Sequence, residues 1–286
     1  AETVPLSITP RTPVRMQVEA LTRAGDSKTV GVIAQLKLQY AGGEPEHALF
    51  LLSRAAATAS GGWSGRWITT FSDPAAAIPQ ASTRAITGFH PTQILDGAGS
   101  QLFFGDAPSG DLIQVDSSVS PAVTRVIDGD AVGDHTSEDV SQGATAVLGS
   151  DGYAQVFYRS RQSGLLRHAW ENKSGWHAEV LDGNGGGERT PDEILPSIAT
   201  ALIDGQPHAW YAARPRGSVG GSLVVRHAWW DVTRWRYETF DGAGGSAGQR
   251  TSPVPMKDPS VVVIHGSPFV SFGAGDTGAL RVAEWR

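Results

Sequence analysis

The chain contains no cysteine and few lysines, and only 18% of its residues are charged. The absence of cysteine excludes disulfides, thiolate nucleophiles and cysteine-ligated zinc or iron–sulfur sites. The net charge of −6 disfavours nucleic acid as a partner, because phosphate binding needs clustered Lys and Arg. No apolar run approaches the ~20 residues needed to cross a bilayer, so we expect no membrane span.

Glycine and proline, in contrast, are abundant, with 35 and 17 of the 286 residues. Many turn-forming residues combined with low charge favour short strands over long, salt-bridged helices. The length fits a single all-β domain. The chain opens at Ala1 without an initiator methionine, as a mature chain does after signal-peptide removal. We therefore expect a secreted, extracellular protein.

An internal repeat organises the chain. The motif LRHAW at 166–170 precedes WHAEVLDG at 176–183, and VRHAW at 225–229 precedes WRYETFDG at 235–242. Each Asp-Gly is followed, eight to ten residues on, by a polar residue and threonine. With a related motif near the start of the chain, these threonines are Thr12, Thr83, Thr136, Thr190 and Thr251. A period of about 40–60 residues with four strands per unit is typical of propeller blades.

The repeat predicts an all-β fold: a five-bladed β-propeller of four-stranded antiparallel blades that forms one domain over residues 1–286. The expected blades are approximately 14–73, 84–129, 142–183, 195–242 and 258–286 together with 4–9. The last unit lacks its fourth strand, and segment 4–9 occupies the position of that strand. We expect the N-terminal strand to complete the C-terminal blade, because a closed ring leaves no unpaired edge between first and last units.

The repeated aromatic and histidine positions favour structural roles. We expect the shared tryptophans to fill the gaps between neighbouring blades, with stacking on a sugar ring as the alternative. These are Trp170, Trp176, Trp229 and Trp235. Three tryptophans outside the shared positions are better candidates for exposed aromatics, namely Trp63, Trp210 and Trp230. His168 and His227 recur at one strand position, which predicts packed, hydrogen-bonded side chains.

The Asp-Gly pairs predict turns, in which Asp accepts local N–H bonds and Gly takes positive φ. Segment 128–134 offers three carboxylates, which makes calcium an alternative there, but it lacks the ligand spacing and closing Glu of a calcium loop. We expect no metal and no cofactor.

Candidate binding residues lie where each outer strand returns to the next inner strand, on the face where propellers usually place their sites. They are Arg11, His135, Arg189 and Arg250, with Trp230 as an aromatic candidate. Such arginines could clamp carboxylate or sulfate groups by bidentate hydrogen bonds. They could equally join blade to blade by bonding carbonyls or nearby acids, which are Glu138, Asp139, Asp192 and Glu193.

Most enzyme motifs are absent from the sequence, including a P-loop, a G-x-G-x-x-G loop, a G-x-S-x-G elbow and H-E-x-x-H. A glycosidase needs only two carboxylates that face each other across a cleft, and 29 acids leave that open. Our main prediction is a secreted, non-enzymatic binding protein that recognises glycan or an extracellular protein through loops on one propeller face. The alternative is a propeller enzyme acting on carbohydrate, a glycoside hydrolase or lyase with its site in the central funnel. Its first candidates are the acids that break the repeat: Glu44, Glu46, Asp106 and Asp111.

The LRHAW and WxxExLDG pattern resembles secreted actinobacterial β-propellers, among them proteins like the dispase autolysis-inducing protein, and more distantly PLL-type propeller lectins. The resemblance is specific over 142–286 and weaker over 84–141. It implies a propeller, an extracellular location, and a secreted protease or transglutaminase as a further partner, with Gln80 and Gln249 as acceptors. Those relatives have seven blades, whereas five units are counted here. No lectin sugar-site motif can be matched, so none is carried over.

Overall fold

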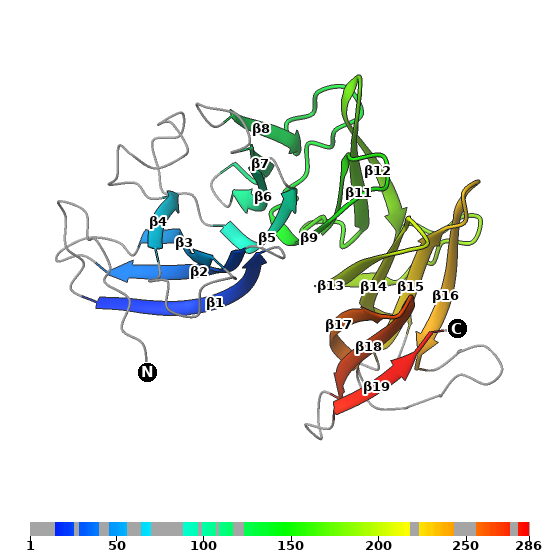
Figure 1. Cartoon of the computed structure of the whole chain (residues 1–286). Coiled ribbons are helices and arrows are strands. Elements are labelled where there is room, and N and C mark those ends of the chain that lie inside the picture. Colours follow the sequence, from blue (N-terminus) through cyan, green and yellow to red (C-terminus); the bar gives the residue numbers. More distant parts are fainter. Residues whose placement is uncertain are drawn as a thin grey trace. The chain divides into compact units, whose positions relative to one another are not determined.

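The computed structural model describes residues 15–25, 29–39, 46–55, 64–69, 88–96, 99–106, 109–116, 123–217, 223–242, 256–274 and 280–285. The described residues form β-strands joined by turns and loops. Among them there is no helix that is long and apolar enough to cross a membrane. The chain divides into two compact units, Ala1–Gly129 and Asp130–Arg286, each of which is considered by itself (Figure 1).

The first unit contains two four-stranded antiparallel sheets whose strands follow one another in chain order. The first sheet consists of β1 (Arg15–Gly25), β2 (Thr29–Gln39), β3 (Glu46–Ala55) and β4 (Ser64–Thr69). The second consists of β5 (Gly88–Asp96), β6 (Gly99–Asp106), β7 (Leu112–Asp116) and β8 (Val123–Asp128).

The second unit contains three sheets with the same sequential, antiparallel order. The third sheet of the chain consists of β9 (Gln142–Leu148), β10 (Ala154–Arg159), β11 (Leu166–Asn172) and β12 (Gly175–Asp182). The fourth consists of β13 (Glu193–Ile203), β14 (Gln206–Arg214), β15 (Val224–Trp230) and β16 (Trp235–Asp241). The fifth has three strands, β17 (Met256–Ile264), β18 (Ser267–Ala274) and β19 (Leu280–Glu284).

The sequence repeat is also a repeat of strand register. The pairing of the third with the fourth strand shifts at the same place in four sheets, between Leu49/Phe50, Leu112/Ile113, Leu166/Arg167 and Val225/Arg226. Tight turns use the residues that positive φ demands: Asp204 and Gly205 have φ of 51° and 76° between β13 and β14. The expected all-β fold of four-stranded antiparallel sheets is therefore confirmed.

In the second unit the first strands of successive sheets lie side by side, β9 next to β13 and β13 next to β17. Thr145 and Thr200 join β9 to β13 through their hydroxyl oxygens, 2.9 Å apart. Gly143 shows how close this approach is, because a Cβ there would lie 2.4 Å from the carbonyl oxygen of Pro196. Only glycine fits this position, which also has a φ of +68°.

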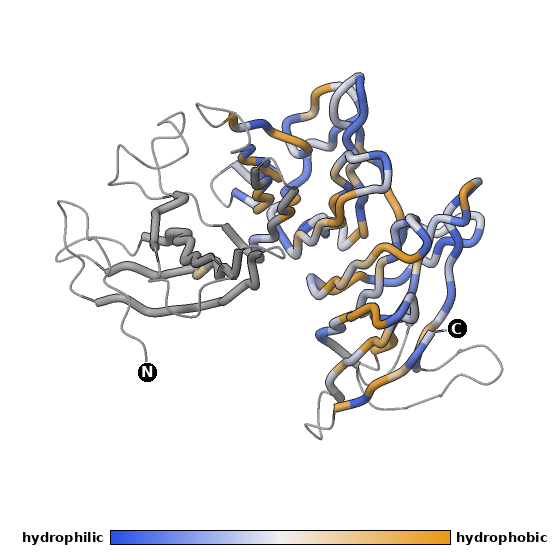
Figure 2. Tube along the Cα trace, in the orientation of Figure 1, coloured by the Kyte–Doolittle hydropathy of each residue, from blue (hydrophilic) through white to orange (hydrophobic). Residues whose placement is uncertain are grey.

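The fourth sheet is covered on both faces, and its sequence reflects this. Pro207 to Ala213 in β14 are all buried. Tyr211 packs towards the third sheet with Phe157 and Leu181, whereas Trp210 packs towards the fifth sheet with Phe272. A strand buried on both faces is apolar throughout instead of alternating. Figure 2 shows hydrophobic segments along strands of the second unit.

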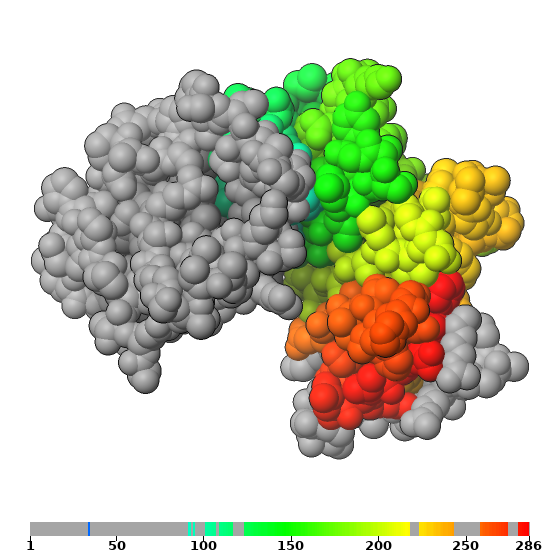
Figure 3. All heavy atoms as spheres, in the orientation of Figure 1, coloured from blue at the N-terminus to red at the C-terminus, as the bar shows by residue number. Residues whose placement is uncertain are grey.

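The fifth sheet ends at its third strand among the described residues, as the sequence predicts. Its edge strand β19 exposes Leu280 (73%) and Val282 (62%), and this sheet, orange to red in Figure 3, lies at the surface of the second unit. The five-blade count and the closed ring stay predictions, and segment 4–9 lies outside the described residues.

Candidate functional site

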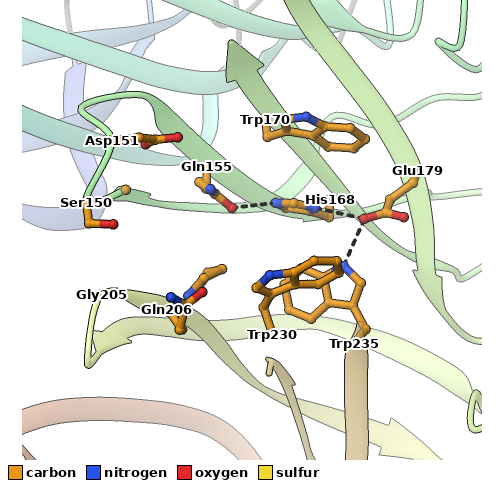
Figure 4. A pocket seen from close by; sticks show the side chains of 12 residues that line it. Ser150, Asp151, Gln155, His168, Trp170, Glu179, Gly205, Gln206, Trp230 and Trp235 are labelled. Carbon is orange, nitrogen blue, oxygen red and sulfur yellow. Dashed lines mark hydrogen bonds and ion pairs between the residues drawn. The ribbon is translucent and has the colours of Figure 1, made fainter. Parts of the chain in front are cut away.

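A cavity of about 440 Å³ lies between the third and fourth sheets (Figure 4). The third sheet contributes Asp151, Gln155, His168, Trp170 and Glu179 to its lining. The fourth sheet contributes Gln206, Trp230 and Trp235, and Figure 4 shows these two groups of side chains facing each other. A pocket of this size with aromatic walls and a few polar groups is of the kind that binds small molecules.

Strand register brings the central polar groups together. His168 in β11 lies opposite Glu179 in β12, and its Nδ1 is 3.1 Å from Glu179 Oε1. The side-chain amide of Gln155 lies 3.0 Å from His168 Nε2. Trp235, from the neighbouring sheet, donates its indole N–H to the same Glu179 Oε1 at 2.9 Å. We call these three residues, His168, Glu179 and Trp235, the first clip, because together they join two sheets.

The first clip sets the charge states at the cavity. Burial lowers the pKa of His168, although the hydrogen bond to Glu179 opposes this, so the imidazole is neutral near pH 7. Burial alone would raise the pKa of Glu179. The hydrogen bonds from His168 and Trp235 and the nearby Arg189 outweigh burial and lower it, so Glu179 is ionised.

The same arrangement occurs between the fourth and fifth sheets. His227 Nδ1 lies 2.8 Å from Glu238 Oε1, and Trp285 donates its indole N–H to that oxygen, also at 2.8 Å. We call His227, Glu238 and Trp285 the second clip. His168 and His227 are both buried, and the prediction of packed, hydrogen-bonded histidines is confirmed. The repetition indicates that the clips hold neighbouring sheets together.

The expected division into tryptophans between sheets and exposed tryptophans is only partly correct. Trp235 fills the space between sheets as predicted, with ring centroids 5.9 Å from Phe157 and 5.1 Å from His168. The expectation of an exposed Trp210 is wrong, because its side chain is fully buried and stacks on His227 at 4.4 Å. Because β14 is covered on both faces, the side chains on its two faces are equally buried. Trp63 lies outside the described residues.

The structure places three of the five predicted binding residues. Trp230 is half-buried and lines the cavity. Arg189 lies close enough to Glu179 to help lower its pKa, and its hydrogen bond to Tyr237 partly opposes the burial that raises the pKa of Tyr237 to about 12. His135 is held within its own loop, with its Nδ1 2.6 Å from Asp130 Oδ1. Arg11 and Arg250 lie outside the described residues.

The acids expected near those residues are already engaged. Asp192 pairs with Arg226 at 2.5 Å, and Glu193 pairs with Arg214 and, at 3.8 Å, with Arg159. Asp139 pairs with Arg161 at 3.4 Å, and Glu138 accepts hydrogen bonds from Ser160 and Ser163. Asp139, Asp192 and Glu193 are therefore neutralised by arginines, and Glu138 is held by two serine hydroxyl groups.

Among the acids proposed for the enzyme alternative, Asp106 stands out in the first unit. Burial raises its pKa, opposed by hydrogen bonding from Ser109, whose hydroxyl donates to Oδ2 at 2.7 Å. Its Oδ1 is buried without a hydrogen-bond partner. Asp111 follows in the loop after β6. Glu44 and the Glu46 side chain lie outside the described residues.

The aspartate of one Asp-Gly turn also forms hydrogen bonds outside the turn itself. Asp182 accepts the Thr190 N–H at 2.6 Å, which gives this threonine of the repeat a structural role, and also the Tyr211 hydroxyl of the next sheet at 2.7 Å. In segment 128–134, where calcium was the alternative to a turn, Asp130 bonds His135, and Asp134 pairs with His177 at 3.2 Å. No group of three or more metal-binding side chains occurs in the described parts of the chain.

No family model and no curated protein matches this chain. Solved structures do match. A GH43_1 enzyme from Xanthomonas citri is 13% identical, with a TM-score of 0.50, over 97% of this chain and 90% of its own. RS223-Beta-xylosidase is 11% identical, with a TM-score of 0.47, over 98% and 96%. An alpha-L-arabinofuranosidase from Clostridium thermocellum is 9% identical, with a TM-score of 0.46, over 88% and 81%.

The likeness to the Xanthomonas citri enzyme supports a β-propeller fold. It also corrects the main functional prediction. The prediction of a non-enzymatic binding protein is contradicted, because the similar solved structure from Xanthomonas citri is an enzyme. The prediction failed because the absence of local catalytic motifs says nothing about carboxylates that only folding brings together.

Proposed function

We propose that this chain is a propeller enzyme that hydrolyses a glycosidic bond, with its substrate in the cavity between the third and fourth sheets. The observation that carries the proposal is the cavity lining, which combines three indoles with two carboxyl groups, Asp151 and Glu179. Indole faces pack against the apolar C–H faces of sugars, and carboxylates and amides bond their hydroxyl groups. The enzymes with similar folds act on carbohydrate, which favours this substrate class.

Hydrolysis of a glycosidic bond uses two carboxyl groups, one to donate a proton to the leaving oxygen and one to act as base or nucleophile. Glu179 fits the second role, because it is ionised and both of its hydrogen bonds converge on Oε1. Asp151, in the turn between β9 and β10, is the other carboxyl group of the lining. It is assigned the proton-donor role, with a proton that its exposed carboxylate takes up from solvent.

The test is hydrolysis of a panel of nitrophenyl glycosides by the wild type and by Glu179→Gln and Asp151→Asn. We expect each variant to lose at least about 100-fold in kcat/KM, the usual scale for a general acid or base. Glu238→Gln is the matched control, because it makes the same change in the second clip, away from the cavity. Equal losses in Glu179→Gln and Glu238→Gln would place the effect in sheet packing, and an inactive wild type would overturn the proposal.

We further propose that the fold is the five-bladed ring that the repeat predicts, closed by segment 4–9 along β19. The three-stranded fifth sheet and the exposed Leu280 and Val282 support this, because a propeller protects its sheet edges. Deleting residues 1–9 should then speed hydrogen exchange of the β19 amides and leave β10 unchanged. Equal exchange of β19 with and without these residues would contradict closure.

A further inference from the structure

The cavity lining carries charge of one sign. Among the described residues that line it, the ionisable side chains are Asp151, His168 and Glu179, and none is Lys or Arg. Burial keeps His168 neutral, so the two carboxylates leave the lining negative. Arg189 acts electrostatically on Glu179, but it does not belong to the lining.

One carboxylate oxygen of the lining is available to a ligand. Glu179 accepts His168 and Trp235 on Oε1, and no described residue bonds its Oε2. Asp151 is exposed, and its Oδ1 accepts only the N–H of Tyr153 in the same turn, at 3.1 Å. Both carboxylates can therefore take a further donor without losing the bonds that hold the fold.

The aromatic walls reinforce this charge. Trp170 stacks with His168 at 5.3 Å, and Trp230 packs against the edge of Trp235 at 5.7 Å. The face of an indole attracts a cation through its quadrupole and repels an anion, and this effect is larger when water is excluded. A ligand between the two sheets meets indoles from both sides and carboxylates from one (Figure 4).

We propose that the cavity selects saccharides by charge: it takes neutral sugars, prefers amino sugars with a protonated amine, and rejects uronic and sialic acids. This rests on the proposed function, since it assigns the substrate class of the same site. An acidic sugar would need an Arg or Lys to pair its carboxylate, and the lining supplies none. A protonated amine can pair with the carboxylates and is also attracted by the indole faces.

The experiment compares four disaccharides of similar size by tryptophan fluorescence titration: one of glucosamine, its N-acetylated form, cellobiose and one containing glucuronate. We expect the glucosamine disaccharide to bind about 10-fold more tightly than the two neutral ones, with the difference shrinking in 0.5 M salt as screening increases. The glucuronate disaccharide should bind most weakly. The N-acetylated form is the internal control, because it removes the charge and retains the sugar.

Asp151→Asn should cut the preference for the amine several-fold, measured as the ratio of the glucosamine-disaccharide affinity to the cellobiose affinity of the same variant. Asp204→Asn, at the corresponding turn of the next sheet and outside the lining, should leave all four affinities unchanged. Glucuronate binding as tightly as glucosamine would overturn the charge selection even if hydrolysis is found. Hydrolysis without binding of any of the four would overturn it too, and the proposed function would stand. Selection by charge with no hydrolysis would instead overturn the enzyme proposal alone.

Discussion

The two clips use the same chemistry but take their tryptophan from different strands. In the first clip, Trp235 is the first residue of a fourth strand, β16. In the second clip, Trp285 directly follows a third strand, β19. Its backbone N–H donates to the carbonyl oxygen of Pro268 and so continues the pairing of β19 with β18. Trp285 thus occupies the position in the fifth sheet that Trp230 occupies in the fourth. Trp230 follows Trp229, which pairs with His208.

The difference in which tryptophan joins the clip decides at which interface a cavity remains between the sheets. Trp285 lies against His208, His227 and Trp229, with ring centroids 5.1, 5.1 and 6.0 Å away. Trp230 instead packs against Trp235 of its own sheet and lines the cavity. Both interfaces therefore keep the same hydrogen bonds from tryptophan and histidine to glutamate. At the first interface Trp235 donates to the glutamate, which leaves Trp230 to line a cavity.

Removing the clip tryptophans should give the largest effect and shows whether the two interfaces carry equal weight. Trp235→Ala removes a buried ring and leaves Glu179 with one donor, so we expect a loss of about 3–5 kcal/mol in unfolding free energy. Trp285→Ala should cost less, because Trp285 is only half-buried. Urea denaturation followed by far-ultraviolet circular dichroism measures both. Equal losses would show that burial does not distinguish the clips.

Acid should weaken the second interface more than the first. Burial and the neighbouring His227 lower the pKa of His208 to about 3, whereas Gln155 holds the corresponding place in the first interface and does not titrate. The unfolded chain binds a proton below about pH 6.5, and the folded one does not until about pH 3. Stability from this group is therefore fully present above pH 6.5 and is lost as the pH falls towards 3.

His208→Gln copies the first interface and tests this difference. The wild type should lose up to roughly 1 kcal/mol more per pH unit between pH 6 and 4 than the variant. Urea midpoints across that range provide the measurement. Parallel pH profiles for the two proteins would mean that His208 is protonated in the folded state.

A smaller effect is expected from the tyrosine that joins the third and fourth sheets. Tyr211 donates to Asp182, and Phe272 occupies the corresponding position in the fifth sheet, where Asp241 pairs with Arg281 at 3.1 Å instead. Tyr211→Phe should cost about 1–2 kcal/mol, because Asp182 keeps the two hydrogen bonds from Thr190. Thermal unfolding measures the change. A loss as large as that of Trp235→Ala would make Asp182, and not the clip, the main link between these sheets.

Much of the fold could be predicted because its signals are local. The strands around LRHAW and WxxExLDG are short, apolar and bounded by turn residues, and Thr190 bonds an aspartate only eight residues earlier. The candidate site was harder. Glu179 lies within the repeat, but the repeat does not indicate its role, because its partner Trp235 lies 56 residues away on another sheet. The repeat of tryptophan, histidine and glutamate together is the signal that could have revealed the clips.

From the amino-acid sequence alone, the protein is determined as a series of four-stranded antiparallel units with buried histidines, because backbone pairing, turns and alternation depend on near neighbours. The cavity, the buried Trp210 and the pairing of acids with arginines were decided by the tertiary structure. Each depends on which side chains of two different sheets meet, and nearly identical repeats place different tryptophans at that meeting point.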